Sequence, residues 1–170
     1  MDAVESRLAG LGLALPNPPV PVGNYVPAAR AGTLVFTSGQ TARLDGVRHW
    51  VGVVGRDVTP AEARLSARDS TLNCLACVKA IAGSLDCVVR VVRVVGFVNA
   101  VEGYEDHADA MEGAGDLLVA LFDERGRAAC TTFGVNALPS NVSVEIELVV
   151  EVQGDEDIRS QARTQDSGCL

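Results

Sequence analysis

Two cysteines three residues apart, Cys74 and Cys77, have the spacing of a metal-binding or redox pair. A structural zinc site needs four ligands, and the two histidines, His49 and His107, lie at no ligand spacing from the pair. Cys74 also falls on the apolar stripe of a predicted helix, where a free cysteine behaves as a small apolar residue. We therefore interpret the pair as part of the core and expect no bound metal ion.

The cysteines as a set indicate a cellular compartment. The sequence has five of them, at positions 74, 77, 87, 130 and 169. An odd count in a chain of 170 residues argues against a disulfide framework and favours free thiols in a reducing compartment. Cys130 stands near the start of a short predicted strand and, taken alone, is one more small apolar residue.

Two glutamates, Glu145 and Glu147, lie on the polar side of a strand predicted over residues 142–152, where apolar and polar residues alternate. A sheet face covered by helices would not tolerate both carboxylates. This face therefore meets either solvent, which is the plainer interpretation, or another subunit.

Other chemistry-bearing residues match no known catalytic or nucleotide-binding motif. The glycines around Gly52 and Gly55 form neither a dinucleotide fingerprint nor a phosphate loop, so we expect them to serve turn geometry and expect no cofactor. Ser38 lies in Ser-Gly-Gln rather than in a nucleophile elbow. His49 and Trp50 fit either ordinary half-buried packing or the wall of a pocket.

Composition excludes several classes of partner. With 14 basic and 22 acidic side chains the net charge is −8, whereas nucleic-acid binders carry a basic footprint. The longest apolar run, residues 87–98, is interrupted by Arg90 and Arg93, so no membrane span is expected. The acidic, polar start of the chain resembles no signal peptide, and we expect a cytoplasmic location.

The elements that must position these residues follow from periodicity and turn signals. Thr59, Pro60 and Glu62 predict the start of a long helix with a capping box. The predicted elements are a helix within 1–15, a hairpin over 25–37, strands at 47–54, 87–98, 129–135 and 142–152, and helices from 59 to about 82 and from 104 to 122. This order predicts one α+β domain, residues 1–153, with helices on one face of a mixed sheet, followed by a mobile polar tail, residues 154–170.

Several short motifs occur in an order that resembles a known family. They are Gly23-Asn24-Tyr25-Val26, Thr37-Ser38-Gly39-Gln40, Gly52-x-x-Gly55-x-Asp57, Leu72-Asn73-x-Leu75-Ala76, Gly96-Phe97-Val98-Asn99, Gly113-Ala114-Gly115-Asp116-Leu117-Leu118, and Leu138-Pro139 ahead of Val144-Glu145-Ile146-Glu147. Over about residues 5–152 the chain is similar to the Rid family, also called YjgF or L-PSP "endoribonuclease", and to its longer subgroup with an Asn-Tyr-Val-Pro opening.

The resemblance implies a chorismate-mutase-like fold, a barrel-like homotrimer and small-molecule pockets between subunits. It also implies cofactor-free hydrolysis of enamines and imines such as 2-aminoacrylate, with an arginine on the substrate carboxylate and a glutamate that orients water. Glu145 matches that glutamate, Tyr25 a pocket tyrosine, and Ser38 and Gly39 the loop after the second strand.

Two positions depart from the family pattern. Cys130 stands where the family has its arginine, and Glu112 stands where the subgroup has asparagine in Asn-Gly-Ala-Ser-Asp. A missing guanidinium would leave a substrate carboxylate without its charge-assisted partner, which costs several kcal/mol.

The leading hypothesis is a small-molecule enzyme on a Rid scaffold that acts on a reactive imine, enamine or carbonyl intermediate, as in specialised metabolism. Cys130 would be nucleophile or acid/base, Glu145 its partner, and Tyr25 a hydrogen-bond donor, with Ser38, Gly39 and Glu112 contacting the substrate. The alternatives are an ordinary imine deaminase that uses water positioned by Glu145, and a non-catalytic metabolite-binding trimer. A ribonuclease is least supported, because the chain is acidic and only 4% aromatic.

Overall fold

The computed structural model describes residues 2–21, 23–44 and 46–154. The helices in these residues are α1 (Ala3–Gly10), α2 (Pro60–Ala82) and α3 (His107–Phe122). The strands are β1 (Ala28–Ala31), β2 (Leu34–Thr37), β3 (Gln40–Thr41), β4 (Arg43–Leu44), β5 (Val47–Arg48), β6 (Val88–Asn99), β7 (Ala129–Val135) and β8 (Val144–Val152). Short 3-10 turns lie at Leu85–Cys87, Asp123–Gly126 and Pro139–Asn141.

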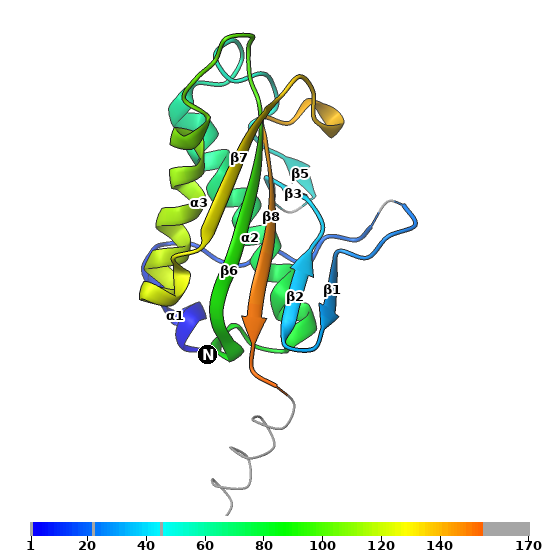
Figure 1. The fold of residues 1–170 in the computed structure, drawn as a ribbon, viewed down its shortest axis with the longest axis vertical. Helices are drawn as coiled ribbons and strands as arrows, with labels where there is room; N and C mark the ends of the chain where they lie inside the picture. Colours follow the sequence, from blue (N-terminus) through cyan, green and yellow to red (C-terminus); the bar gives the residue numbers. More distant parts are fainter. Residues whose placement is uncertain (1, 22, 45, 155–170) are drawn as a thin grey trace, which may run out of the picture.

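A mixed sheet in the order β1-β2-β8-β6-β7 forms the body of the molecule, and β3 also pairs with β8. Only the β6–β7 pairing in it is parallel. Helices α2 and α3 lie together against one face of this sheet (Figure 1). The predicted α+β fold with helices on one face is therefore confirmed. The predicted tail lies outside the described residues, apart from Gly154.

The hairpin, the long helix α2 and the strands β6, β7 and β8 were all predicted within a few residues of their bounds. The strand predicted over residues 47–54 is wrong beyond Arg48, because Trp50 and Gly52 have φ angles of 57° and 133° that interrupt an extended chain. The helix predicted from residue 104 begins at His107, and the first helix ends at Gly10.

Helix α2 begins with the predicted capping box. The Thr59 hydroxyl accepts a hydrogen bond from the backbone N–H of Glu62 at 3.3 Å, and a Glu62 carboxylate oxygen accepts from the backbone N–H of Thr59 at 2.8 Å. These bonds satisfy two amide groups that the first turn leaves without partners. The start of α2 is therefore fixed locally, before its buried side chains meet the sheet.

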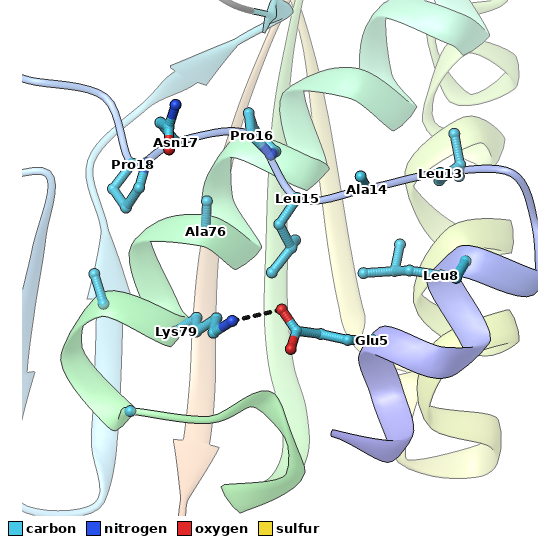
Figure 2. A pocket seen from close by; sticks show the side chains of 13 residues that line it. Glu5, Leu8, Leu13, Ala14, Leu15, Pro16, Asn17, Pro18, Ala76 and Lys79 are labelled. Carbon is cyan, nitrogen blue, oxygen red and sulfur yellow. Dashed lines mark hydrogen bonds and ion pairs between the residues drawn. The ribbon is translucent and has the colours of Figure 1, made fainter. Parts of the chain in front are cut away.

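The chain before the hairpin packs along α1 and α2 (Figure 2). The backbone N–H groups of Ala3 and Val4 donate to the carboxylate of Asp86 at 2.8 and 2.9 Å, which caps α1 from a distant turn. Glu5 pairs with Lys79 on α2 at 2.5 Å. This arm continues into the prolines at 16–21, which lead the chain to the edge of β2.

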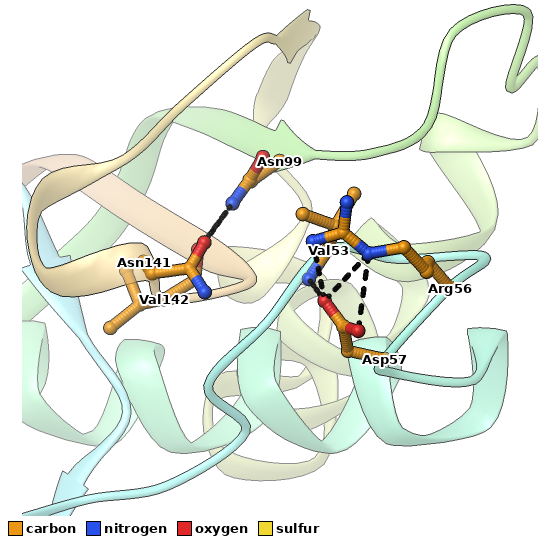
Figure 3. A network of polar contacts seen from close by, with 6 residues as sticks. All are labelled: Val53, Arg56, Asp57, Asn99, Asn141 and Val142. Atoms are coloured by element: carbon orange, nitrogen blue, oxygen red, sulfur yellow. Dashed lines mark hydrogen bonds and ion pairs between the residues drawn. The ribbon is translucent and has the colours of Figure 1, made fainter.

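The loop between β5 and α2 holds the start of β8 in place (Figure 3). Asp57 accepts from the Val53 backbone N–H at 3.0 Å and from the guanidinium of Arg56. The Asn99 backbone N–H donates to the Ser143 carbonyl at 2.9 Å, and its side-chain amide donates to the Val142 carbonyl at 3.2 Å. The backbone just before Glu145 is therefore held from two sides.

Helices α2 and α3 lie close together at Gly113. A Cβ atom built on Gly113 would lie 1.9 Å from the carbonyl oxygen of Arg64 and 2.7 Å from its carbon. Both are backbone atoms of α2, so the contact cannot be relieved by a side-chain rotation. Two residues further along α3, Gly115 has no atom within 4 Å of the same position.

Alanine at these two glycines should therefore have opposite effects on stability. We expect Gly113→Ala to lower the free energy of unfolding by about 1–3 kcal/mol, because α2 and α3 must separate. We expect Gly115→Ala to raise it by roughly 0.5–1 kcal/mol, because alanine has the higher helix propensity. Urea unfolding followed by circular dichroism measures both, and equal effects would contradict the close helix contact.

Candidate functional site

A pocket of about 320 Å³ opens where β3 pairs with β8. Four of the side chains predicted from the sequence line it: Tyr25, Ser38, Gly39 and Glu145. The remaining lining residues are Pro19, Val20, Pro21, Pro27, Gln40, Thr41, Arg43, Arg48, Asn73, Pro139 and Ser140. This volume lies at the lower end of the range of small-molecule pockets.

A register shift between β2, β3 and β8 creates the floor of this pocket. Phe36 pairs with Val149, but the next pair is Gln40 with Ile146, so the β2–β3 segment contains one extra residue. The Thr37 hydroxyl accepts a hydrogen bond from the backbone N–H of Leu148 at 2.9 Å. The extra residue forms a β-bulge that lifts residues 38–39 off the sheet, a device that often lies beside active sites.

Glu145 lies directly beneath this bulge. It pairs with Thr41 across β3 and β8, and its side chain points away from the buried Val144 and Ile146. A Cβ atom on Gly39 would lie 1.9 Å from Oε1 of Glu145. Glycine is therefore required at position 39 for the carboxyl group to occupy this place.

Burial raises the pKa of Glu145 above the ordinary value of 4.5, and repulsion from Glu147 adds to the effect. Desolvation disfavours the charged form of a carboxyl group. The negative charge of a second carboxylate on the same face disfavours it too, so both effects raise the pKa of Glu145. Glu145 thus holds a proton more readily than a solvated glutamate, which suits a group that accepts and returns protons.

Ser38 and Tyr25 also line the pocket. The Ser38 hydroxyl donates to the carbonyl of Val26 at 2.7 Å, and its backbone N–H donates to the carbonyl of Pro27 at 2.9 Å. These bonds tie the loop that carries Tyr25 to the end of β2. The Tyr25 side chain is half exposed, so its hydroxyl is accessible to a ligand.

Cys130 and Glu112 lie elsewhere in the chain. Cys130 is exposed on β7 and pairs with Val94, whose side chain enters the core on the helix side of the sheet. Glu145 pairs with Phe97, which faces the other side. Within one chain, then, Cys130 and Glu145 lie on opposite faces of the sheet, and Glu112 is exposed on α3.

The Cys74–Cys77 pair is buried on α2, which confirms its interpretation as part of the core. The Cys74 thiol donates to the carbonyl of Ile146 at 3.3 Å and accepts from the Thr37 hydroxyl at 3.7 Å. Burial raises the pKa of both thiols, to about 11 for Cys77. Cys74 thus also supports the bulge, a role that its type and spacing did not reveal.

Sequence reasoning missed three polar residues of the pocket: Arg43, Arg48 and Asn73. In the structure Gln40 and Ala42 are buried, which places Arg43 on the pocket side of the chain, but Gln-Thr-Ala-Arg shows no apolar alternation from which this could have been predicted. Asn73 is 2% exposed on α2, and its side-chain amide donates to the carbonyls of Arg43 and Asp69.

In the part of the chain that the structure describes, no three histidine, cysteine or carboxylate side chains are grouped to hold a metal ion. Nor is any helix there long and apolar enough to cross a bilayer.

Two long helices on one face of a mixed sheet, with a small carboxyl-containing pocket at a strand bulge, define a protein of the chorismate-mutase-like class. Residues 5–152 match the family described as "YjgF/chorismate_mutase-like, putative endoribonuclease", and the chain belongs to this family. The resemblance of the sequence to this family is thereby confirmed.

Known relatives cover most of the chain. Atu1372 of Agrobacterium tumefaciens, a protein of unknown function, is 38% identical with a TM-score of 0.84, over 89% of this chain and 94% of its own. Protein TCP17 of Trypanosoma cruzi is 33% identical over 150 residues, 88% of this chain and 94% of that protein. TdcF of E. coli, solved with bound serine, is 25% identical with a TM-score of 0.58, over 81% and 94% of the two chains.

The raised pKa of Glu145 has a consequence for stability. A carboxyl group whose pKa is higher in the folded protein favours folding at low pH, and this contribution is lost as the pH rises through the folded pKa. We therefore expect Glu145→Gln to raise the thermal unfolding midpoint at pH 8, with a gain that disappears as the pH falls below 4.5.

Calorimetry of wild type and variant across this pH range measures the effect. Glu105→Gln, at an exposed glutamate outside the pocket, serves as the matched control. A gain at pH 8 that persists unchanged at low pH would contradict a desolvated Glu145 carboxyl group.

Proposed function

We propose that the pocket around Glu145 is the active site of a small-molecule enzyme that hydrolyses a reactive imine or enamine, or acts on a related carbonyl intermediate. The observation that carries the proposal is a half-buried carboxyl group of raised pKa beside the hydroxyl-bearing residues Tyr25 and Ser38. Serine bound to TdcF supports a ligand derived from an amino acid. We place the reaction in the cytoplasm and, because position 130 departs from the family pattern, in specialised metabolism.

The hydrolysis needs only water and proton transfers. The Glu145 carboxylate accepts a proton from water while the water oxygen bonds to the imine carbon, and the electron pair of the C=N bond moves to nitrogen. The nitrogen takes up this first proton from Glu145, which gives the carbinolamine. Glu145 then accepts the proton of the carbinolamine hydroxyl and passes it to the nitrogen, the C–N bond breaks, and ammonia leaves as the carbonyl forms. An enamine enters the same sequence after protonation at carbon. Tyr25 donates a hydrogen bond to the reacting oxygen.

Glutamine at position 145 retains the shape of the side chain but cannot accept the proton. We therefore expect Glu145→Gln to lower the rate of 2-iminopropionate hydrolysis by about 10²–10⁴-fold, the usual contribution of a general base. A coupled assay that generates the imine enzymatically and follows its disappearance measures this rate. Glu105→Gln should match wild type, and an undiminished rate in Glu145→Gln would refute the mechanism.

The sheet face opposite the helices supports assembly into a homotrimer. Phe36 and Phe133 on this face are 42% and 48% exposed, and Phe133 stacks on Phe97 with ring centroids 5.9 Å apart. Monomeric proteins rarely expose large apolar patches without a function. We propose that subunits associate through this face and along the edge strand β7, so that Cys130 of a neighbouring chain lines the pocket, where its thiol relays a proton to the leaving nitrogen.

Substitution of Cys130 tests this role in the assembled protein. Because neither a methyl group nor a serine hydroxyl replaces a thiol as proton donor, Cys130→Ala and Cys130→Ser should both lower turnover at least tenfold. Cys87→Ala, at a half-buried cysteine outside the pocket, should leave turnover unchanged. Light scattering should give three times the chain mass of 17.7 kDa for every variant. Full turnover in both Cys130 variants would show that the thiol donates no proton and that Cys130 only lines the pocket.

A further inference from the structure

Two arginines of the same chain line the Glu145 pocket: Arg43 on β4 and Arg48 on β5. They pair directly across the short hairpin that these strands form. Like charges placed opposite each other in a strand pair repel and destabilise it, so the pair needs a compensating negative charge. The hairpin thus brings two positive charges into a pocket that is also lined by the carboxyl group of Glu145.

The position of Arg43 is fixed from two directions. Thr41 pairs with Glu145, and since Ala42 is buried, Thr41 and Arg43 lie on the other, pocket side of the chain. The buried side-chain amide of Asn73 donates to the Arg43 carbonyl at 2.9 Å, which fastens β4 to α2. The Arg43 backbone therefore does not depend on the ligand for its place.

Five other arginines of the described chain are neutralised by carboxylates. Ion pairs join Arg7 to Asp123, Arg56 to Asp57, Arg64 to Asp109, Arg68 to Asp69 and Arg127 to Glu124. Arg43 and Arg48, like the exposed Arg90 and Arg93 on β6, take part in no ion pair with a described residue, but of these four only Arg43 and Arg48 line the pocket. In a chain with a net charge of −8, two unneutralised cations in one pocket favour an anionic ligand.

We propose that Arg43 and Arg48 form an anion-binding subsite that grips the carboxylate of a small 2-imino or 2-oxo acid. A planar guanidinium binds a carboxylate through two parallel N–H···O bonds, the strongest neutral-pH contact available to this ligand. The subsite lies in the same chain as Glu145, so it supplies the charge that Cys130 lacks without help from another subunit. Only the choice of a 2-imino or 2-oxo acid as the ligand rests on the proposed function; the anion-binding subsite itself is inferred from the two arginines.

Binding can be measured without turnover, by using stable 2-oxo acids. Trp50, the single tryptophan, lies two residues after Arg48, and its indole N–H donates to Asp69 at 2.9 Å, so its fluorescence reports on this hairpin. We would titrate pyruvate into wild type, Arg43→Gln, Arg48→Gln and the double variant, with calorimetry as a second readout. Arg90→Gln removes an exposed arginine that does not line the pocket and is the matched control.

Each single variant should weaken pyruvate binding by about tenfold or more, the usual effect of losing a hydrogen bond to a charged group. Arg43→Lys should lie between wild type and Arg43→Gln, because lysine keeps the charge without the bidentate geometry. Pyruvamide, which lacks the negative charge, should bind weakly and equally to all variants. Arg90→Gln should bind pyruvate as wild type does.

Two results would overturn the subsite. One is equal pyruvate affinity in wild type and the double variant, with unfolding midpoints that show both to be folded. The other is competition by inorganic phosphate at the same concentration as pyruvate, which would indicate a general anion site. If Glu145→Gln retains pyruvate binding while imine hydrolysis is absent in wild type, the subsite stands and the proposed reaction fails.

Discussion

The single extra residue between β2 and β3 is the constraint on which the site depends. A continuous ladder would have kept Ser38 and Gly39 in the plane of the sheet beside β8. Instead, the Thr37 hydroxyl bonds to Leu148 and Ser38 and Gly39 leave the sheet before Gln40 rejoins it. The opening exists because the two strands are out of step by one residue, and the buried Cys74 thiol beneath it holds that offset in place.

The fold could be predicted because its elements bury periodic apolar faces. The alternation in β8 and the capping box at Thr59 are local signals, and the structure reproduces both. The strand expected beyond Arg48 is interrupted at Trp50, which adopts a positive φ that is rare for a bulky residue and whose indole N–H donates to Asp69 on α2. Propensity reports what a residue favours, whereas tertiary contacts decided the conformation here.

The site was predictable only in part. Glu145, Tyr25, Ser38 and Gly39 follow from family motifs, and the structure brings them into one pocket. Arg43 could not be assigned, because its place depends on a bulge and on an amide from α2 that is 30 residues distant in sequence. Sequence reasoning looked for a guanidinium at position 130, where the chain has a cysteine, and so overlooked cations on a hairpin.

The burial of two of the cysteine thiols affects how the protein withstands oxidation. Cys74 and Cys77 are sealed in the core, and their raised pKa values keep them in the unreactive thiol form. Cys130, by contrast, is exposed at the edge of the sheet. Oxidants would therefore react with Cys130 on the edge strand long before they reach Cys74 and Cys77. Peroxide would then oxidise this one thiol while the fold remained intact.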